Sequence, residues 1–92
     1  MNKNNWILNL KLDGEVTPLL RIFLLMRKFR VSVVRMKLEK DVELGECMVE
    51  MTLDFSIATR VETVFKKLNR FFDVLGLSFY PEGQKDKEIF LK

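Results

Sequence analysis

Few side chains in this sequence could do catalytic chemistry. It has no histidine and one cysteine, Cys47, which excludes Ser-His-Asp and Cys-His catalysis, a His/Cys zinc cluster and a disulfide scaffold. Cys47 alternates in step with Val49 and Met51, a pattern that predicts an inert thiol in the core. Two carboxylates, Glu50 and Asp54, fall on the polar side of the same segment, with no obvious cleft around them. We therefore predict no catalytic residue, no metal site and no cofactor.

Charge is distributed unevenly along the chain. Residues 18–38 contain six basic side chains and no acidic one, whereas residues 39–55 contain six acidic side chains and one lysine. Such a separation suits an oriented partner or an anionic ligand, and a merely solvated face is the alternative. Duplex DNA is a third possible partner on charge alone, although we expect no nucleic acid to be the natural one.

Size and composition indicate one small globular domain. The chain has 92 residues, 48% of them hydrophobic and 32% charged. We assign residues 1–81 to the domain and residues 82–92 to a charged tail, which either frays or adds an edge strand. The longest apolar run, Ile22 to Met26, is far shorter than the roughly 20 residues that span a bilayer, and the first residues do not resemble a signal peptide. We expect a cytoplasmic protein without a membrane partner.

Alternating apolar residues predict four strands. They cover residues 6–12, 31–39, 47–55 and 75–80, and the third has the clearest alternation. In the second, Val31 and Val33 share one parity, whereas Val34, Met36 and Leu38 have the other. One extra residue near position 34 or 35, a β-bulge, would reconcile the two runs.

Two helices are predicted between these strands. The first starts at Thr17-Pro18 and extends to about Phe29, because threonine caps a helix well and proline suits the first turn. Its expected core stripe is Leu19, Ile22, Phe23, Met26 and Phe29. The second helix, capped by Ser56 or Thr59, has an expected stripe of Val61, Val64, Phe65, Leu68, Phe71 and Phe72.

The element order predicts the fold class. The order is β-α-β-β-α-β, and right-handed crossovers put both helices on one face of a four-stranded antiparallel sheet. This is the α+β, ferredoxin-like sandwich. The other face would carry a mixed set of side chains, either solvated or paired: Ile7, Asn9, Lys11, Met48, Glu50, Thr52 and Ser78.

The first helix has an unusual outer stripe. Leu24 and Leu25 stand in the middle of its expected solvent face, flanked by Arg21 and Lys28. Leaving two leucines in water forgoes up to about 1.5–3 kcal/mol each relative to burial. We predict that Arg21, Leu24, Leu25 and Lys28 form a partner interface; the alternative is that the apolar end of the tail covers the leucines.

Two segments carry a resemblance to a known family. Leu19-Leu20-Arg21-Ile22-Phe23, followed by residues 27–33, resembles the first helix and second strand of the small subunits of acetohydroxyacid (acetolactate) synthase, which contain an ACT domain. Residues 61–74, with Leu68-Asn69-Arg70 and Phe72-Asp73-Val74, resemble the second helix of the short small subunits. The resemblance covers about residues 5–80.

This resemblance implies a regulatory role. ACT domains associate side by side and bind amino acids between subunits, so it implies a homodimer that binds and activates the thiamine-dependent catalytic subunit in branched-chain amino acid biosynthesis. It places a branched-chain amino acid site at Thr17, Pro18, Leu19 and Ser32. Pro18 replaces a glycine of the amino-acid-binding members and Ser32 replaces an asparagine, so both positions depart from the pattern of those members. The sequence resembles more the short form, which does not have the second domain of the longer small subunits. The rival interpretation is a stand-alone ACT-domain sensor of a free amino acid.

Overall fold

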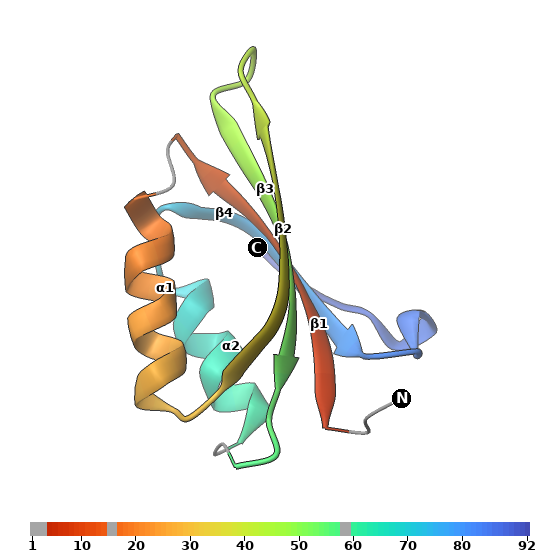
Figure 1. The fold of residues 1–92 in the computed structure, drawn as a ribbon. Helices are drawn as coiled ribbons and strands as arrows, with labels where there is room; N and C mark the ends of the chain where they lie inside the picture. The colour runs from red at the N-terminus through yellow and green to blue at the C-terminus, as the bar shows by residue number, and fades with distance from the viewer. Residues whose placement is uncertain (1–3, 15–16, 58–59) are drawn as a thin grey trace.

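The computed structural model describes residues 4–14, 17–57 and 60–92 and has an α+β architecture. Five antiparallel strands form one sheet in the order β2-β3-β1-β4-β5, and both helices lie on one face of it (Figure 1). The elements are β1 (Asn5–Asp13), α1 (Thr17–Lys28), β2 (Ser32–Asp41), β3 (Glu46–Asp54), α2 (Val61–Asn69), β4 (Val74–Pro81), a 3-10 turn (Lys85–Lys87) and β5 (Ile89–Leu91).

The core lies between the sheet and the helices. β1 is the central strand and pairs with β3 on one side and β4 on the other. Its side chains alternate, so that Leu8, Leu10 and Leu12 are buried against the helices. Cys47 of β3 is also fully buried, which confirms its predicted place in the core.

The predicted bulge in β2 is confirmed. Val33 pairs with Leu53 and Arg35 with Thr52, so Val34 has no partner on β3. The extra residue changes which parity faces the helices, and Met36 and Leu38 therefore point to the same side of the sheet as Val33.

Helix α1 begins at Thr17 as predicted, but its buried face differs from the expected one. Leu19, Ile22 and Met26 are buried. Phe23, predicted to be in the core, is exposed, whereas Leu25, predicted to face solvent, is half-buried against the core. The buried stripe is therefore rotated about the helix axis toward α2.

Helix α2 is shorter than predicted. It ends at Asn69, so Phe72 falls in the following turn and is 80% exposed instead of lying in the core. Arg60 occupies the N-cap position without a side-chain cap. Ser56, one of the two predicted caps, does not cap this helix, because it lies several residues before Val61 and its hydroxyl and backbone N–H donate to Asp54 Oδ1. Thr59, the other predicted cap, is outside the described residues.

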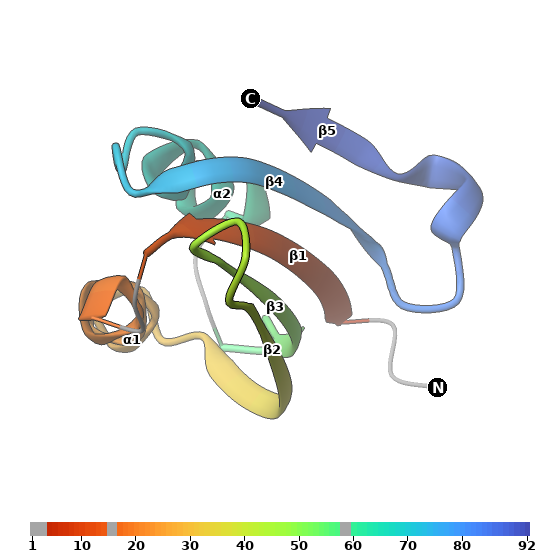
Figure 2. The same ribbon diagram turned by 90° about the horizontal axis from the view of Figure 1, so that it is seen from above.

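The tail changes the strand count. The sheet has five strands instead of the predicted four, because Ile89–Leu91 pair with residues 77–79 of β4 (Figure 2). Of the two alternatives for the tail, fraying or an edge strand, the structure confirms the edge strand. Three side-chain hydrogen bonds hold this segment: the Ser78 hydroxyl donates to Glu88 Oε2 at 2.6 Å, and Lys92 Nζ donates to the carbonyls of Phe71 and Val74 at 2.6 and 2.7 Å.

The sheet face turned away from the helices carries both polar and apolar side chains, as expected, but not all of them are exposed to solvent. Thr52 and Ser78 are buried on it, whereas Met48 and Glu50 are exposed. Neither helix in the described part of the chain has the length and apolar content that crossing a bilayer requires.

Candidate interaction surface

The described residues bring together no group of three or more potential metal ligands. Glu50 is exposed on the open sheet face, and the carboxylate of Asp54 accepts hydrogen bonds from the Ser56 hydroxyl and backbone N–H. These two bonds lower the pKa of Asp54 below its usual range because they stabilise the charged form. The two carboxylates thus have separate surroundings and form no acid–base pair in this part of the molecule.

The β2 strand is the most conspicuous surface feature. It stands at one edge of the sheet, and all ten of its residues are exposed. Its inner side pairs with β3, and no strand among the described elements pairs with its outer side. Long exposed edges are templates for pairing with another chain, so this edge is a candidate interface.

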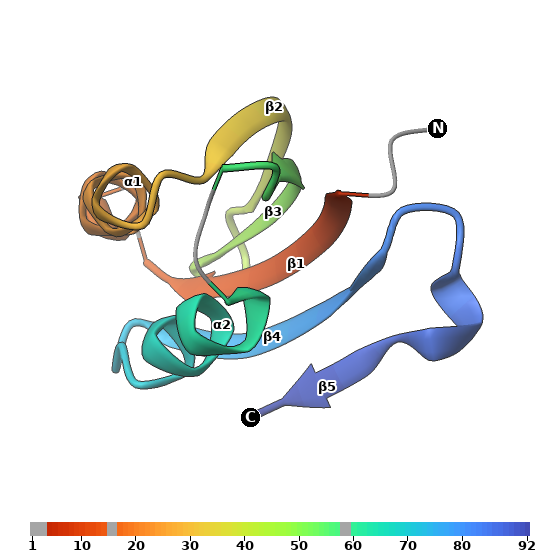
Figure 3. The ribbon, with the colours of Figure 1, turned by 90° about the horizontal axis from the view of Figure 1, so that it is seen from below.

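Apolar side chains flank this edge on the helix side of the sheet. Met36 and Leu38 pair with Met51 and Val49, which are buried in the core, and directly opposite residues share a face. Met36 and Leu38 are nevertheless exposed, because α1 does not cover them. Figure 3 shows α2 beside β4 and α1 on the side of the sheet toward β2.

Helix α1 adds a second apolar stripe. Leu20, Phe23 and Leu24 have the three- and four-residue spacing of one helix face, and all three are exposed. On the other flank Arg21 donates to Asp73 at 2.6 Å and lies over the Phe71 ring, beside the end of α2. The apolar stripe therefore faces away from α2. We call this stripe, together with the exposed apolar residues of β2 that pair with core residues of β3, the edge surface: Leu20, Phe23, Leu24, Val33, Met36 and Leu38.

The other face of β2 is charged in a regular order. Thr52, Glu50, Met48 and Glu46 of β3 lie opposite Arg35, Lys37, Glu39 and Asp41 of β2. Two basic residues are therefore followed by two acidic ones along the same face of the edge strand.

The structure separates the four predicted partner-contact residues. Leu24 and Lys28 are exposed and available. Arg21 is engaged with Asp73, and Leu25 is half-buried. The sequence analysis did not include Leu20 and Phe23 among the partner-contact residues. The run of apolar residues through 19–26 indicated that some of them would be exposed, but it did not indicate which side of the helix would remain uncovered.

The predicted effector residues do not form one site in a single copy. Pro18 and Leu19 are buried in the first turn of α1, and Ser32 is exposed at the start of β2, beyond the other end of that helix. A 12-residue helix is about 18 Å long, so the two groups are far apart. Only two copies could bring them together. The Thr17 side chain lies outside the described part of the structure.

Comparison with known proteins does not identify this chain. No family model matches it, and no curated protein has a matching sequence.

Proposed function

We propose that this protein is a non-catalytic regulatory subunit of the cytoplasm that pairs with a second copy of itself through β2. The observation that carries the proposal is the exposed ten-residue edge strand with apolar side chains on one face. The catalytic partner we propose is the acetohydroxyacid synthase catalytic subunit, on the basis of the sequence resemblance.

The topology supports an ACT-like, ferredoxin-like sandwich within the larger sheet. The first four strands and the two helices follow the order β-α-β-β-α-β, with β1 and β3 in the centre. β5 is then an addition at the β4 edge, which leaves the β2 edge free for side-by-side association.

The charges on β2 favour one register for the pairing of two copies. Antiparallel pairing about a two-fold axis at Leu38 places Lys37 opposite Glu39 of the second copy, and Arg35 opposite its Asp41. All four charges on that face then meet an opposite charge, and Leu38 meets itself on the apolar face. Shifting the axis to Lys37 would place that lysine opposite itself, and an axis at Met36 would place Arg35 opposite Lys37. Opposite charges across strands stabilise a pair and like charges destabilise it.

The α1 stripe is the surface we assign to the catalytic subunit. Leu20 and Leu24 are two-thirds exposed, and Arg27 and Lys28 lie beside them. An apolar patch with a basic border fits a partner groove with an acidic rim.

Co-purification with the catalytic subunit, and its rate of acetolactate formation, test this assignment. We expect Leu24→Asp to reduce binding and activation at least tenfold. Leu44→Asp is the matched control: Leu44 at the β2–β3 turn is 67% exposed and Leu24 is 65% exposed, but Leu44 does not belong to α1. Equal effects of the two variants, or no effect of Leu24→Asp, would contradict the proposed contact.

The rival sensor function makes a different prediction. Calorimetric titration with valine, leucine and isoleucine would then give saturable heat, and Ser32→Ala would abolish it. We expect no such heat, because the buried Pro18 has no amide hydrogen to offer a carboxylate.

A further inference from the structure

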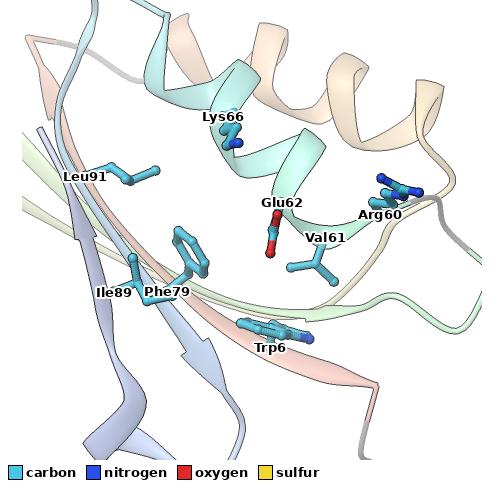
Figure 4. Close-up of a pocket in the computed structure, with 8 residues that line it drawn as sticks. All are labelled: Trp6, Arg60, Val61, Glu62, Lys66, Phe79, Ile89 and Leu91. Carbon is cyan, nitrogen blue, oxygen red and sulfur yellow. The ribbon is translucent and has the colours of Figure 1, made fainter.

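A cavity of about 570 Å³ opens between α2 and the β4–β5 edge, on the other side of the molecule from β2 (Figure 4). This volume is within the range of about 300–1,000 Å³ that is typical of small-molecule sites. Its apolar lining comes from β1, α2, β4 and β5: Trp6, Val61, Phe79, Ile89 and Leu91. None of these residues belongs to the edge surface, so the cavity is separate from the surfaces assigned above.

Aromatic packing orders one wall of the cavity. The Trp6 ring lies 6.0 Å from the Phe65 ring and 5.9 Å from the Phe79 ring, measured between centroids. Phe65 and Phe79 stack at 4.1 Å, and Phe65 is fully buried. A ligand would therefore meet a wall that is already in place, which lowers the entropic cost of binding.

Three charged side chains line the cavity without giving it an excess of either charge. Figure 4 shows the Glu62 carboxylate directed from α2 into the cavity and the Arg60 guanidinium directed away from it. Lys66, the third, follows Glu62 by four residues, a spacing at which opposite charges on a helix attract each other. The charge of Glu62 is therefore offset by Lys66, and Arg60 does not act on a ligand inside the cavity.

The Glu62 carboxylate offers a ligand a hydrogen-bond acceptor. No described residue donates a hydrogen bond to it or lies close enough to form an ion pair with it. A carboxylate can only accept hydrogen bonds, so a polar atom of the ligand that meets Glu62 has to carry a hydrogen.

We infer that this cavity binds an uncharged amphipathic molecule, with an apolar body of the size of a medium-chain alkyl group and a hydroxyl group that donates to Glu62. The apolar body replaces water against Trp6, Phe79 and Leu91. An anionic head group would meet the Glu62 carboxylate and a cationic one would meet Lys66, and either would lose hydration beside the apolar wall. The inference does not depend on the proposed pairing through β2.

Trp6 supplies the readout. It is the only tryptophan of the chain and lines the cavity, so its fluorescence reports occupancy. The probes are octanol, octanoate and octylamine, each titrated at neutral pH, below its solubility limit and below the concentration at which it forms micelles. We expect saturable binding, with octanol at least fivefold tighter than either charged probe. Equal or tighter binding of octanoate or octylamine, or the absence of saturation, would overturn the inference.

A pair of isomers tests the hydrogen bond to Glu62. Heptyl methyl ether has the same atoms as octanol but no hydroxyl hydrogen to donate. We expect Glu62→Leu to lower the affinity for octanol relative to the ether at least fivefold. Glu43→Leu, at an exposed glutamate of the β2–β3 turn that does not line this cavity, should leave the ratio unchanged. The same ratio in the wild-type chain and Glu62→Leu would show that Glu62 does not receive the hydroxyl.

A pair of β5 variants locates the site. Ile89 and Phe90 are neighbours that face opposite sides of the sheet, and of the two only Ile89 lines the cavity. Ile89→Asp should weaken octanol binding at least tenfold, because it places a carboxylate in the apolar lining, and Phe90→Asp should not. Equal effects of the two variants would contradict the assignment of the site, even if both fold.

Discussion

The two edges of the sheet are built in opposite ways. β2 is ten residues long, exposed throughout, and flanked by the apolar stripe of α1. β5 is three residues long, and Glu88 and Lys92 fasten its two ends to β4 and to the turn before it. Short edge strands resist pairing with other chains, and long apolar ones invite it. The comparison shows that β5 covers one edge of the sheet within the same chain, whereas no described strand covers β2, the edge that we propose for pairing with a second copy.

The largest expected effect comes from placing charges on the proposed two-fold axis. Leu38→Lys puts two like charges opposite each other and removes two apolar side chains from the interface. We expect the dissociation constant of the dimer to rise about a hundredfold or more. Sedimentation equilibrium measures it, with Leu44→Lys as the control. If the wild-type chain is already monomeric at high concentration, β2 does not pair with a second copy and its exposure has another cause.

Removing β5 should open the closed edge. Deletion of residues 89–92 removes the ladder with β4 and the two hydrogen bonds of Lys92. A few net hydrogen bonds at about 0.5–1.5 kcal/mol each predict a loss of about 2 kcal/mol in the free energy of unfolding, measured with urea. Phe90→Ser, at a side chain that is 74% exposed, should change it little. Pairing through β2 should persist in both, so a deletion that dissociates the dimer would contradict the assignment of the edges.

A charge swap on β2 tests the register itself. Lys37→Glu places the new carboxylate opposite Glu39 of the second copy, once on each side of the axis, and should weaken the dimer about tenfold. Combining it with Glu39→Lys restores both attractive pairs when the axis is at Leu38. Rescue by the double change, again measured by sedimentation, is the expected result. An axis at Lys37 predicts no rescue.

The packing of α1 against the turn that follows α2 should depend on Arg21. This side chain donates to Asp73 and lies 4.9 Å from the centre of the Phe71 ring. The pair is partly exposed, so Arg21→Gln should lower the free energy of unfolding by about 0.5–1 kcal/mol. Arg27→Gln on the open flank should change it less. Equal losses would show that Arg21 does not fasten the helix.

The smallest expected effect is electrostatic. Burial, followed by the nearby charges of Glu50 and Glu88, raises the pKa of Tyr80 above its ordinary value of 10.0. The folded chain then holds this proton more tightly than the unfolded chain, so the associated stability is present below that value and is lost as pH rises through the raised pKa. Tyr80 is the only tyrosine, and its phenolate absorbance can be followed during titration. Glu88→Gln should bring the pKa part of the way down, and no change would show that Glu88 does not act on it.

Much of the sheet could be predicted from the sequence because strand alternation is a local property. The alternation of β1 and β3 and the bulge at Val34 all follow from which side chains recur at every second position. The start of α1 could be predicted for a similar reason, because proline suits the first turn of a helix and Pro18 lies there.

The candidate surfaces required the tertiary structure. Periodicity places a residue at an angle around a helix axis, but the neighbouring elements decide which angle is covered: α2 and its following turn cover the Leu25 flank and leave Phe23 open. The same holds for the end of α2, where Phe72 continues an apolar pattern after the helix has stopped. The exposure of β2 depends on strand order, and the cavity depends on four elements that are distant in sequence. The sequence by itself determined which faces are apolar, whereas the contacts between elements decided which of those faces remained uncovered.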